Sequence, residues 1–279
     1  QLEWDSRPSV GVVLASGGID VSFTAIGALT MYAITKAVFA WWPDAPFALI
    51  LATGALGGVL LGLLNGVLVY RLKAPSLIVT IGTQYLYRGV LLTFVGTTFF
   101  MNIPHSMDRF GRIPLIAYQT ADGLHAVLPI SVIALVVAAL ATWWLLNRTM
   151  MGRAVYAMGG SLAIAERLGY NLRAVHLFVF GYTGLLAGLA GILHVSNNRI
   201  ANPFDLVGSE LDVIAAVILG GARITGGSGT VVGTLLGVVL VTLINNVLIL
   251  VGVPSTWQKV IVGAFILIAG TLFVLRRRG

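Results

Sequence analysis

Residues Phe47–Tyr70 read FALILATGALGGVLLGLLNGVLVY, a run without a charged side chain. An α-helix needs about 20 apolar residues to cross a bilayer, so this run is long enough. It carries glycines at four-residue spacing: Gly54, Gly58, Gly62 and Gly66. Small residues at that spacing let two backbones approach closely in lipid, where van der Waals contact holds helices together. The stretch predicts a transmembrane helix packed tightly on one face.

The rest of the chain extends this prediction to an all-α, polytopic transmembrane helix bundle. Only 10% of the 279 residues are charged and 58% are hydrophobic, whereas a soluble domain carries about 25% charged residues. A partial element is expected at Ser9–Ala15, and Pro254 divides the run that starts at Thr230. The two parts of that run, Phe47–Tyr70 and five further segments give at least eight membrane segments. The five are Val21–Ala40, Ser76–Phe100, Ala126–Asn147, Ala174–Asn197 and a short Leu211–Ala222.

Further glycine ladders distinguish packed helices from lipid-facing ones. Two more segments repeat the four-residue spacing, and Ala126–Asn147, which lacks glycine, is expected to lie outermost against lipid. A shift of about 180 residues aligns Gly57 to Leu68 with Gly237 to Leu248, which matches the two asparagines Asn65 and Asn245. The alignment suggests an inverted repeat, which is typical of transporters. The glycines of the two further ladders are Gly184, Gly188, Gly229, Gly233 and Gly237.

The net charge of +7 follows the membrane topology and does not indicate nucleic-acid binding. Basic residues lie at the ends of apolar runs, as the positive-inside rule describes. If the segment 148–173 is cytoplasmic, so is the C-terminus, and Leu211–Ala222 must cross or nearly cross. This orientation places Arg71, Lys73, Arg148, Arg153, Arg167, Arg173, Arg223 and Arg276–Arg278 inside, and Lys36, Arg109, Arg112, Arg199 and Lys259 outside.

Several kinds of chemistry are excluded or weakly indicated. The chain has no cysteine, its histidines lack metal-ligand spacing, and no phosphate-binding loop is present, so ATP must be hydrolysed by another polypeptide. We expect no bound cofactor and no metal site. Gly226–Gly229 (GGSG) matches the pattern of intramembrane serine proteases, with His176 or His194 as a base. Because the run also reads as a turn, a protease is a remote alternative.

A polar stripe marks the segment Ser76–Phe100. Its members recur at i, i+3, i+4, i+7 and i+8, which places them on one face of a helix. They are Thr80, Thr83, Gln84, Tyr87 and Arg88. A charge in the membrane costs about 2.5–3.5 kcal/mol on insertion scales. Arg88 therefore either reaches the outer interface, caps a broken helix, or lines a polar route.

Two further pairs of polar residues are candidates. Asn65 and Asn245 either join this solute route or hydrogen-bond between helices. Asp20 and Asp212 open apolar segments, where a carboxylate caps free N–H groups. A stand-alone channel or ion-coupled transporter would use them as buried ion-coupling groups. This is the alternative to an importer subunit.

The segment 148–173 is the most charged internal loop. It predicts a short amphipathic helix, Ser161–Leu168, with Ser161 as N-cap and Gly169 as its stop. Such an exposed helix, bearing Glu166 and Arg167, is suited to docking a soluble partner. Residues 1–8 are polar and read as a leader or scar, and residues 9–279 form one transmembrane domain.

Several motifs together resemble the permease subunits of bacterial ABC importers for ribose, xylose, galactose and autoinducer-2. They cover the chain from about Val10 to its end. The motifs are Ser16–Ser22 (SGGIDVS), Gly62–Val69 (GLLNGVLV), Ile81–Gly89 (IGTQYLYRG), the nine residues Gly152–Gly160, Gly184–Ile192 (GLLAGLAGI), Glu210–Gly221 (ELDVIAAVILGG) and Gly226–Thr234 (GGSGTVVGT).

The resemblance implies partners and a division of labour. A second permease copy or a paralogue would complete the bundle in the inner membrane, a periplasmic protein would deliver the solute, and cytoplasmic ATPase subunits would use ATP and magnesium. It implies that the ATPase seats on a coupling helix within Gly159–Gly169, whose candidate residues are Gly159, Gly160, Ser161, Ala163, Glu166, Arg167 and Gly169. Relatives usually carry more membrane helix before Gly17, so we expect segments missing there. The motifs do not name the solute.

Overall fold

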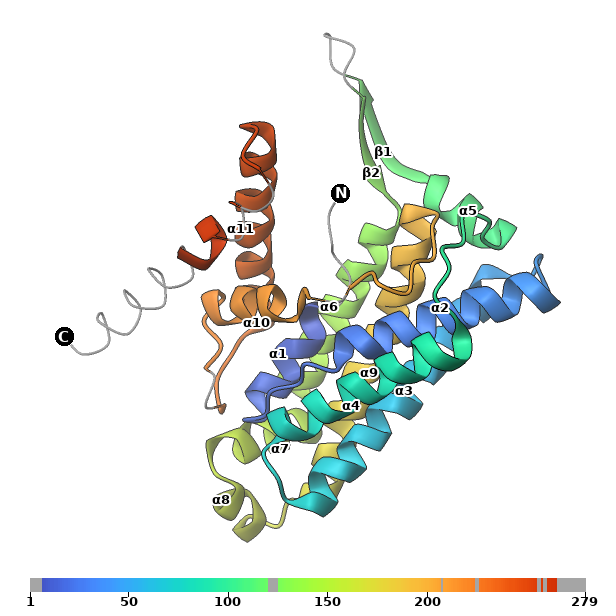
Figure 1. The fold of residues 1–279 in the computed structure, drawn as a ribbon. Helices are drawn as coiled ribbons and strands as arrows, with labels where there is room; N and C mark the ends of the chain where they lie inside the picture. Colours follow the sequence, from blue (N-terminus) through green and yellow to red (C-terminus); the bar gives the residue numbers. More distant parts are fainter. Residues whose placement is uncertain are drawn as a thin grey trace.

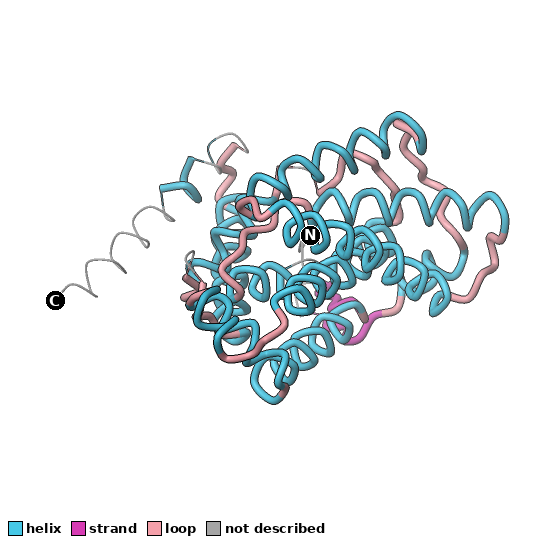
Figure 2. Tube along the Cα trace, turned by 90° about the horizontal axis from the view of Figure 1, so that it is seen from below, coloured by secondary structure: helices cyan, strands magenta, loops and turns pink. Residues whose placement is uncertain are grey.

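The computed structural model describes residues 7–119, 125–206, 208–223, 226–254, 257 and 260–264. Helices form most of the described trace (Figures 1 and 2). In chain order the elements are α1 Arg7–Ala15, α2 Phe23–Trp41, α3 Phe47–Leu72, α4 Ser76–Val90, a π-helical turn Leu91–Val95, α5 His105–Arg112, β1 Pro114–Gln119, β2 His125–Pro129, α6 Ser131–Arg148, α7 Met150–Gly160, α8 Leu162–Arg167, α9 Leu172–Asn198, α10 Glu210–Leu219 and α11 Val231–Leu250.

The contact between α3 and α9 lies at the centre of the bundle. A Cβ atom added at Gly58 would overlap the carbonyl oxygen of Gly184, and one added at Gly184 would overlap the carbonyl oxygen of Gly58. Gly54 and Gly188 pack against each other in the same way one turn away. Gly62 backs against the carbonyl of Phe180, and Gly66 lies against His176 and Leu177. The glycines therefore bring two backbones into direct contact, as close packing in lipid requires.

A second glycine ladder joins α11 to α10. A Cβ atom added at Gly233 would overlap the carbonyl oxygen of Gly220, and a Cβ atom added at Gly237 would overlap the carbonyl oxygen of Ala216. Gly229 lies against Ala222 at the turn that precedes α11. In Figure 1, α10 and α11 stand to one side of the group formed by α2, α3, α4 and α9. The bundle is thus built from two glycine-packed pairs.

Six helices of the described chain are long and apolar enough to cross a membrane: α2, α3, α4 with its π-helical turn, α6, α9 and α11. The expected count of at least eight is not confirmed. α10 has ten residues, about 15 Å at 1.5 Å per residue, which is half of a 30 Å hydrocarbon core. The segment after Pro254 lies largely outside the described residues.

Two segment boundaries differ from the sequence prediction. α6 begins at Ser131 rather than Ala126, because His125–Pro129 forms strand β2 of an antiparallel hairpin with β1. Ile116 pairs with Leu128 in this hairpin, which projects from one end of the bundle (Figure 1). α4 ends in a π-helical turn that stops at Val95, and Phe100 pairs instead with Ala201. Hydrophobicity alone does not distinguish an apolar strand, such as β2, or an apolar loop segment from a helix.

The loop 148–173 contains two helices where the sequence indicated one. α7 was missed, and its buried residues, including Val155 and Met158, belong to the hydrophobic core. Gly159, near its end, packs against the carbonyl of Ala15 and against Gly227. The Gly227 N–H also donates to the Ala15 carbonyl over 3.0 Å. Gly159 is therefore part of a junction between α1, α7 and the glycine-rich loop.

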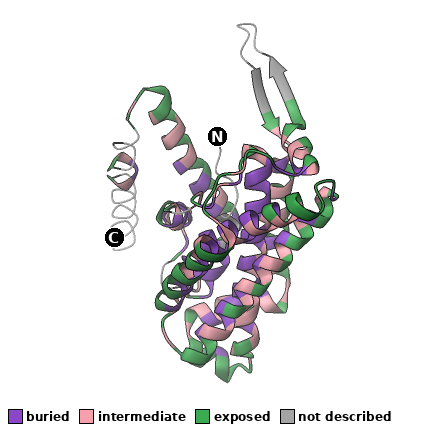
Figure 3. Ribbon diagram, turned by 45° about the vertical axis from the view of Figure 1, so that its right-hand side comes forward, coloured by how far each residue is buried: buried purple, intermediate pink, exposed green. Residues whose placement is uncertain are grey.

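α8 has the predicted local features. The Ser161 hydroxyl accepts the N–H of Ile164, and Gly169 adopts a φ of +83°, the left-handed conformation that ends many helices. α8 lies at the end of the bundle opposite the hairpin (Figure 1). Figure 3 shows buried residues gathered inside the bundle and exposed ones at the base of the hairpin and at the bundle's lower end.

Basic residues divide between the two ends of the bundle. Asn197, at the end of α9, hydrogen-bonds Ser131 at the start of α6, so the two helices run in opposite directions. Arg148 and Arg173 consequently share the end that carries α7 and α8, whereas α5 packs near the other end through Gly111 and Ser196. Arg276–Arg278 and Lys259 lie outside the described residues.

Candidate solute route and partner-binding surface

The polar stripe on α4 faces the interior of the bundle. Thr80, Thr83 and Tyr87 are buried, while Gln84 and Arg88 lie half-buried at the edge of that face. The Thr80 hydroxyl hydrogen-bonds the Ile19 carbonyl, and the Thr83 hydroxyl donates to the carbonyl of Thr80. Thr80 and Thr83 are thus buried against the bundle in this structure, and Thr80 contacts the turn before α2, so their place in the solute lining stays a prediction.

Asn65 also lies in the interior. Its amide donates to the Ser22 hydroxyl over 2.6 Å and its oxygen accepts the Tyr87 hydroxyl over 2.8 Å. Ser22 in turn donates both its N–H and its hydroxyl to one oxygen of Asp20. Asp20 is 1% exposed. This chain of hydrogen bonds joins α2, α3 and α4, so Asn65 has the helix-joining role that the sequence left as one of two readings.

Glu210, the first residue of α10, is the buried acid that the sequence analysis missed. Its Oε1 accepts the Gln84 amide and the Thr24 hydroxyl, each over 2.7 Å. Glu210 is 8% exposed. In the sequence, Asp212 is a candidate for the cap of this helix or for a buried ion-coupling group. Asp212 is exposed and lies in the first turn of α10, and the N-cap is Ser209. Because charge-assisted hydrogen bonds are the stronger kind, Glu210 links α10 firmly to α2 and α4.

The Arg88 side chain has no hydrogen bond or ion pair with another described residue. It adjoins the outward face of α4, defined by Ile78, Gly82, Tyr85, Gly89 and Thr93. All five are exposed, and a Cβ added at either glycine would meet nothing within 4 Å. An arginine in a membrane helix is tolerated where it meets protein or water. The edge of α4 that carries Arg88 therefore needs protein or water beside it.

Asn245 is separate from this region. It lies half-buried on α11, which packs against α10, α1 and α6. α3, which carries Asn65, packs against α9, α2 and α4. The structure does not bring the two asparagines together, because the two glycine-packed pairs occupy different parts of the bundle. α3 and α11 do run in opposite directions (Figure 1), as the expected inverted repeat requires.

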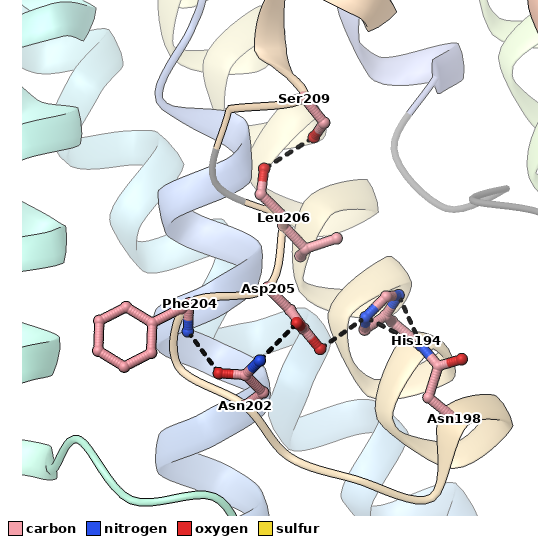
Figure 4. Close-up of polar contacts among 7 residues, drawn as sticks. All are labelled: His194, Asn198, Asn202, Phe204, Asp205, Leu206 and Ser209. Atoms are coloured by element: carbon pink, nitrogen blue, oxygen red, sulfur yellow. Dashed lines mark hydrogen bonds and ion pairs between the residues drawn. The ribbon is translucent and has the colours of Figure 1, made fainter. Parts of the chain in front are cut away.

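A polar cluster fixes the link from α9 to α10 (Figure 4). Asp205 contacts His194 at 3.2 Å and accepts the Asn202 amide over 2.7 Å. Asn198 hydrogen-bonds the His194 ring. No hydrogen bond joins Ser228 to a described histidine, and His176 stacks obliquely on Tyr70. The described residues therefore form no serine–histidine pair, which a serine protease needs.

α8 presents a second candidate surface. Leu162, Ile164 and Leu168 are 54%, 57% and 66% exposed, and Glu166 and Arg167 lie beside them. Ala165 is the buried residue that anchors the helix to the core. Exposed apolar side chains rimmed by charges are typical of protein–protein interaction sites. Of the predicted coupling residues, Ala163 shares this exposure, whereas Gly159 packs inside the junction with α1.

A bundle of glycine-packed spanning helices, with a polar helix edge and an exposed helical knob outside the membrane, defines a membrane permease that works with other subunits. The sequence profile of the family "Branched-chain amino acid transport system / permease component" matches residues 9–270. The chain therefore belongs to this family. It is a multi-pass inner-membrane protein and a transport subunit rather than an enzyme.

Named relatives agree with this assignment. The autoinducer 2 import system permease protein LsrC of Yersinia pseudotuberculosis is 33% identical over 264 residues, which cover 92% of this chain and 69% of that protein. The ribose import permease protein RbsC of Escherichia coli K12 is 34% identical over 259 residues, with coverages of 92% and 78%. No solved structure gave a significant match.

Proposed function

We propose that this chain is one of two permeases in an ABC importer for a small polyhydroxylated solute, a sugar such as ribose or the sugar-like autoinducer 2. The relatives' names supply the solute class. The polar edge of α4 agrees with it, because amide and guanidinium groups hydrogen-bond hydroxyl oxygens.

The observation that carries the proposal is Arg88 at the edge of the outward face of α4, whose side chain has no partner among the residues that the structure describes. Lipid would leave this guanidinium unsolvated at a cost of about 2.5–3.5 kcal/mol on insertion scales. All three helices expose large apolar side chains, for example Leu86 on α4, Leu140 on α6 and Leu236 on α11, but α11 carries no charged residue and α6 carries one only at its last position. The faces of α6 and α11 suit lipid, and the α4 face suits a water-filled route closed by a second permease.

Glu210 and Gln84 border this route. Because Glu210 begins α10 and Gln84 lies one turn from Arg88, a shift of α10 changes the groups that the route offers to the solute. Alternating access requires such a two-state element. We place the seat of the ATPase on α8, at the basic end of the bundle, which makes that end and the C-terminus cytoplasmic. A periplasmic binding protein would then dock at the hairpin end.

Cysteine chemistry tests the route, because the native chain has no cysteine. Tyr85→Cys should react with a water-soluble thiol reagent and form a disulfide-linked dimer in membranes. Leu140→Cys, on the lipid-facing side of α6, is the matched control and should do neither. Equal labelling at both positions would refute the route on α4.

Reconstitution tests the importer function. Proteoliposomes should take up ribose or autoinducer 2 only when the ATPase, ATP and binding protein are all present. Uptake by the permease alone would instead support the stand-alone channel or ion-coupled transporter.

A further inference from the structure

An open cavity of about 920 Å³ lies between the end of α3, the start of α9 and α8. This volume is within the range of small-molecule sites. It is separate from the outward face of α4, since its lining comes from the ends of helices and the turn after α1. Neither the family nor the named relatives assign a ligand to it.

Two cations from different elements line the cavity. Lys73 follows α3 with a φ of +50°, a left-handed conformation that is uncommon for a side chain other than glycine. Arg173 lies in the first turn of α9. Both are exposed, and neither forms an ion pair with another described residue. The cavity therefore offers two cationic groups to a ligand.

The remaining lining groups refine the ligand chemistry. Glu166 of α8 is the one acid among the described lining residues, so the formal charge of Lys73, Arg173 and Glu166 together is +1. Asn171 adds an amide, and Tyr70 lies against His176 with ring centroids 6.2 Å apart. A singly charged phosphodiester fits the cations, while hydroxyl groups on the same ligand can donate to Glu166 and Asn171.

The position of the cavity selects the source of that phosphodiester. It lies at the ends of two membrane-spanning helices, α3 and α9, where phospholipid headgroups are found. Basic pockets between transmembrane helices on the cytoplasmic side bind anionic headgroups, and tyrosine is enriched at that level. We propose that this cavity binds the headgroup of an anionic phospholipid, with the phosphoglycerol group of phosphatidylglycerol as the fitting chemistry.

Lipid titration followed by native mass spectrometry tests the site on the purified full chain. Phosphatidylglycerol should bind more tightly than phosphatidylcholine. The double variant Lys73→Gln with Arg173→Gln should lose about tenfold in affinity for phosphatidylglycerol, since each basic residue near a membrane surface adds to the attraction of an anionic headgroup. The matched control, Arg71→Gln with Arg148→Gln, removes the same charge at the same end outside the cavity and should change affinity less than twofold.

Four outcomes would overturn the proposal. The first is an equal loss of phosphatidylglycerol affinity in the two double variants, and the second is equal binding of the two lipids by the native chain. The third is competition by glycerol 3-phosphate as effective as that of the lipid. The fourth is a Lys73→Gln with Arg173→Gln variant that loses ATPase co-purification while its phosphatidylglycerol binding is unchanged. The third would assign the cavity to a free phosphate compound and the fourth to the protein partner. Lys73→Arg with Arg173→Lys retains both charges and should retain binding, which separates loss of the site from loss of folding.

Discussion

The Gln84 amide of α4 donates a 2.7 Å hydrogen bond to Glu210, the first residue of α10, across 126 positions of sequence. The same carboxylate oxygen accepts the hydroxyl of Thr24 on α2. A single buried oxygen thus holds three helices together, and Gln84 lies one turn along α4 from Arg88. This junction connects the proposed solute route to the short helix α10.

Replacing Glu210 should separate its structural and transport roles. Glu210→Ala removes the acceptor of the half-buried Gln84 amide and leaves the buried Thr24 hydroxyl only the Val21 carbonyl at 3.4 Å, so we expect a lower melting temperature. Glu210→Gln retains an oxygen acceptor and should melt within a few degrees of the native protein while transport falls. Thermal melting in detergent and uptake in proteoliposomes measure the two effects. If Glu210→Ala melts like the native chain, the junction contributes nothing to stability.

Gln84→Leu should lower transport while assembly with the ATPase persists. The substitution removes a polar group from the edge of α4 and leaves α8 unchanged. Leu140→Ala on the exposed side of α6 is the control and should transport normally. Uptake assays together with co-purification of the ATPase provide the measurement. Normal uptake by Gln84→Leu would show that the polar edge of α4 has only a structural role.

The glycine contact between α3 and α9 predicts a strong position dependence. Gly58→Ala forces a Cβ against the carbonyl of Gly184, and overpacking typically costs about 1–3 kcal/mol. Gly58→Leu and Gly62→Leu should abolish folded protein. Gly82→Ala makes the same change where nothing lies within 4 Å. Melting temperatures should fall for Gly58→Ala and stay level or rise for Gly82→Ala, and the reverse order would contradict the packing.

The network around Asn65 predicts a loss of stability from one removed hydroxyl. Tyr87→Phe deletes the donor shared by Asn65 and the Leu61 carbonyl. A buried acceptor left without a donor costs about 1–3 kcal/mol. Tyr85→Phe is the control because Tyr85 is 70% exposed. Melting in detergent distinguishes them, and equal melting of both variants would show that the network is dispensable.

Reversing two charges on α8 should weaken the ATPase contact selectively. Glu166→Arg with Arg167→Glu leaves the core intact, since surface ion pairs contribute about 0–1 kcal/mol. We expect normal membrane insertion with reduced ATPase co-purification. Ala163→Cys should crosslink to the ATPase, whereas Thr97→Cys, exposed beyond α4 at the other end, should not. If Ala163→Cys crosslinked only to periplasmic components, the proposal that the α8 end is cytoplasmic would be wrong.

The membrane character, most of the long helices and the glycine faces on which they pack follow from the sequence alone. An uncharged run such as Phe47–Tyr70 has one favourable environment, and Gly58 and Gly62 specify a face because only glycine permits backbone contact. The cap at Ser161 and the stop at Gly169 are likewise local. Each depends on residues within a few positions, which a single sequence displays directly.

Tertiary structure alone decided which polar groups meet. The period of α4 placed Thr80, Gln84 and Arg88 on one face, but only the packing of α2 shows that this face points inward. Glu210 looked like an ordinary residue at a helix start, because its partners Thr24 and Gln84 are far away in sequence. The cost of burying a polar group depends on its neighbours in space, and periodicity carries no information about them.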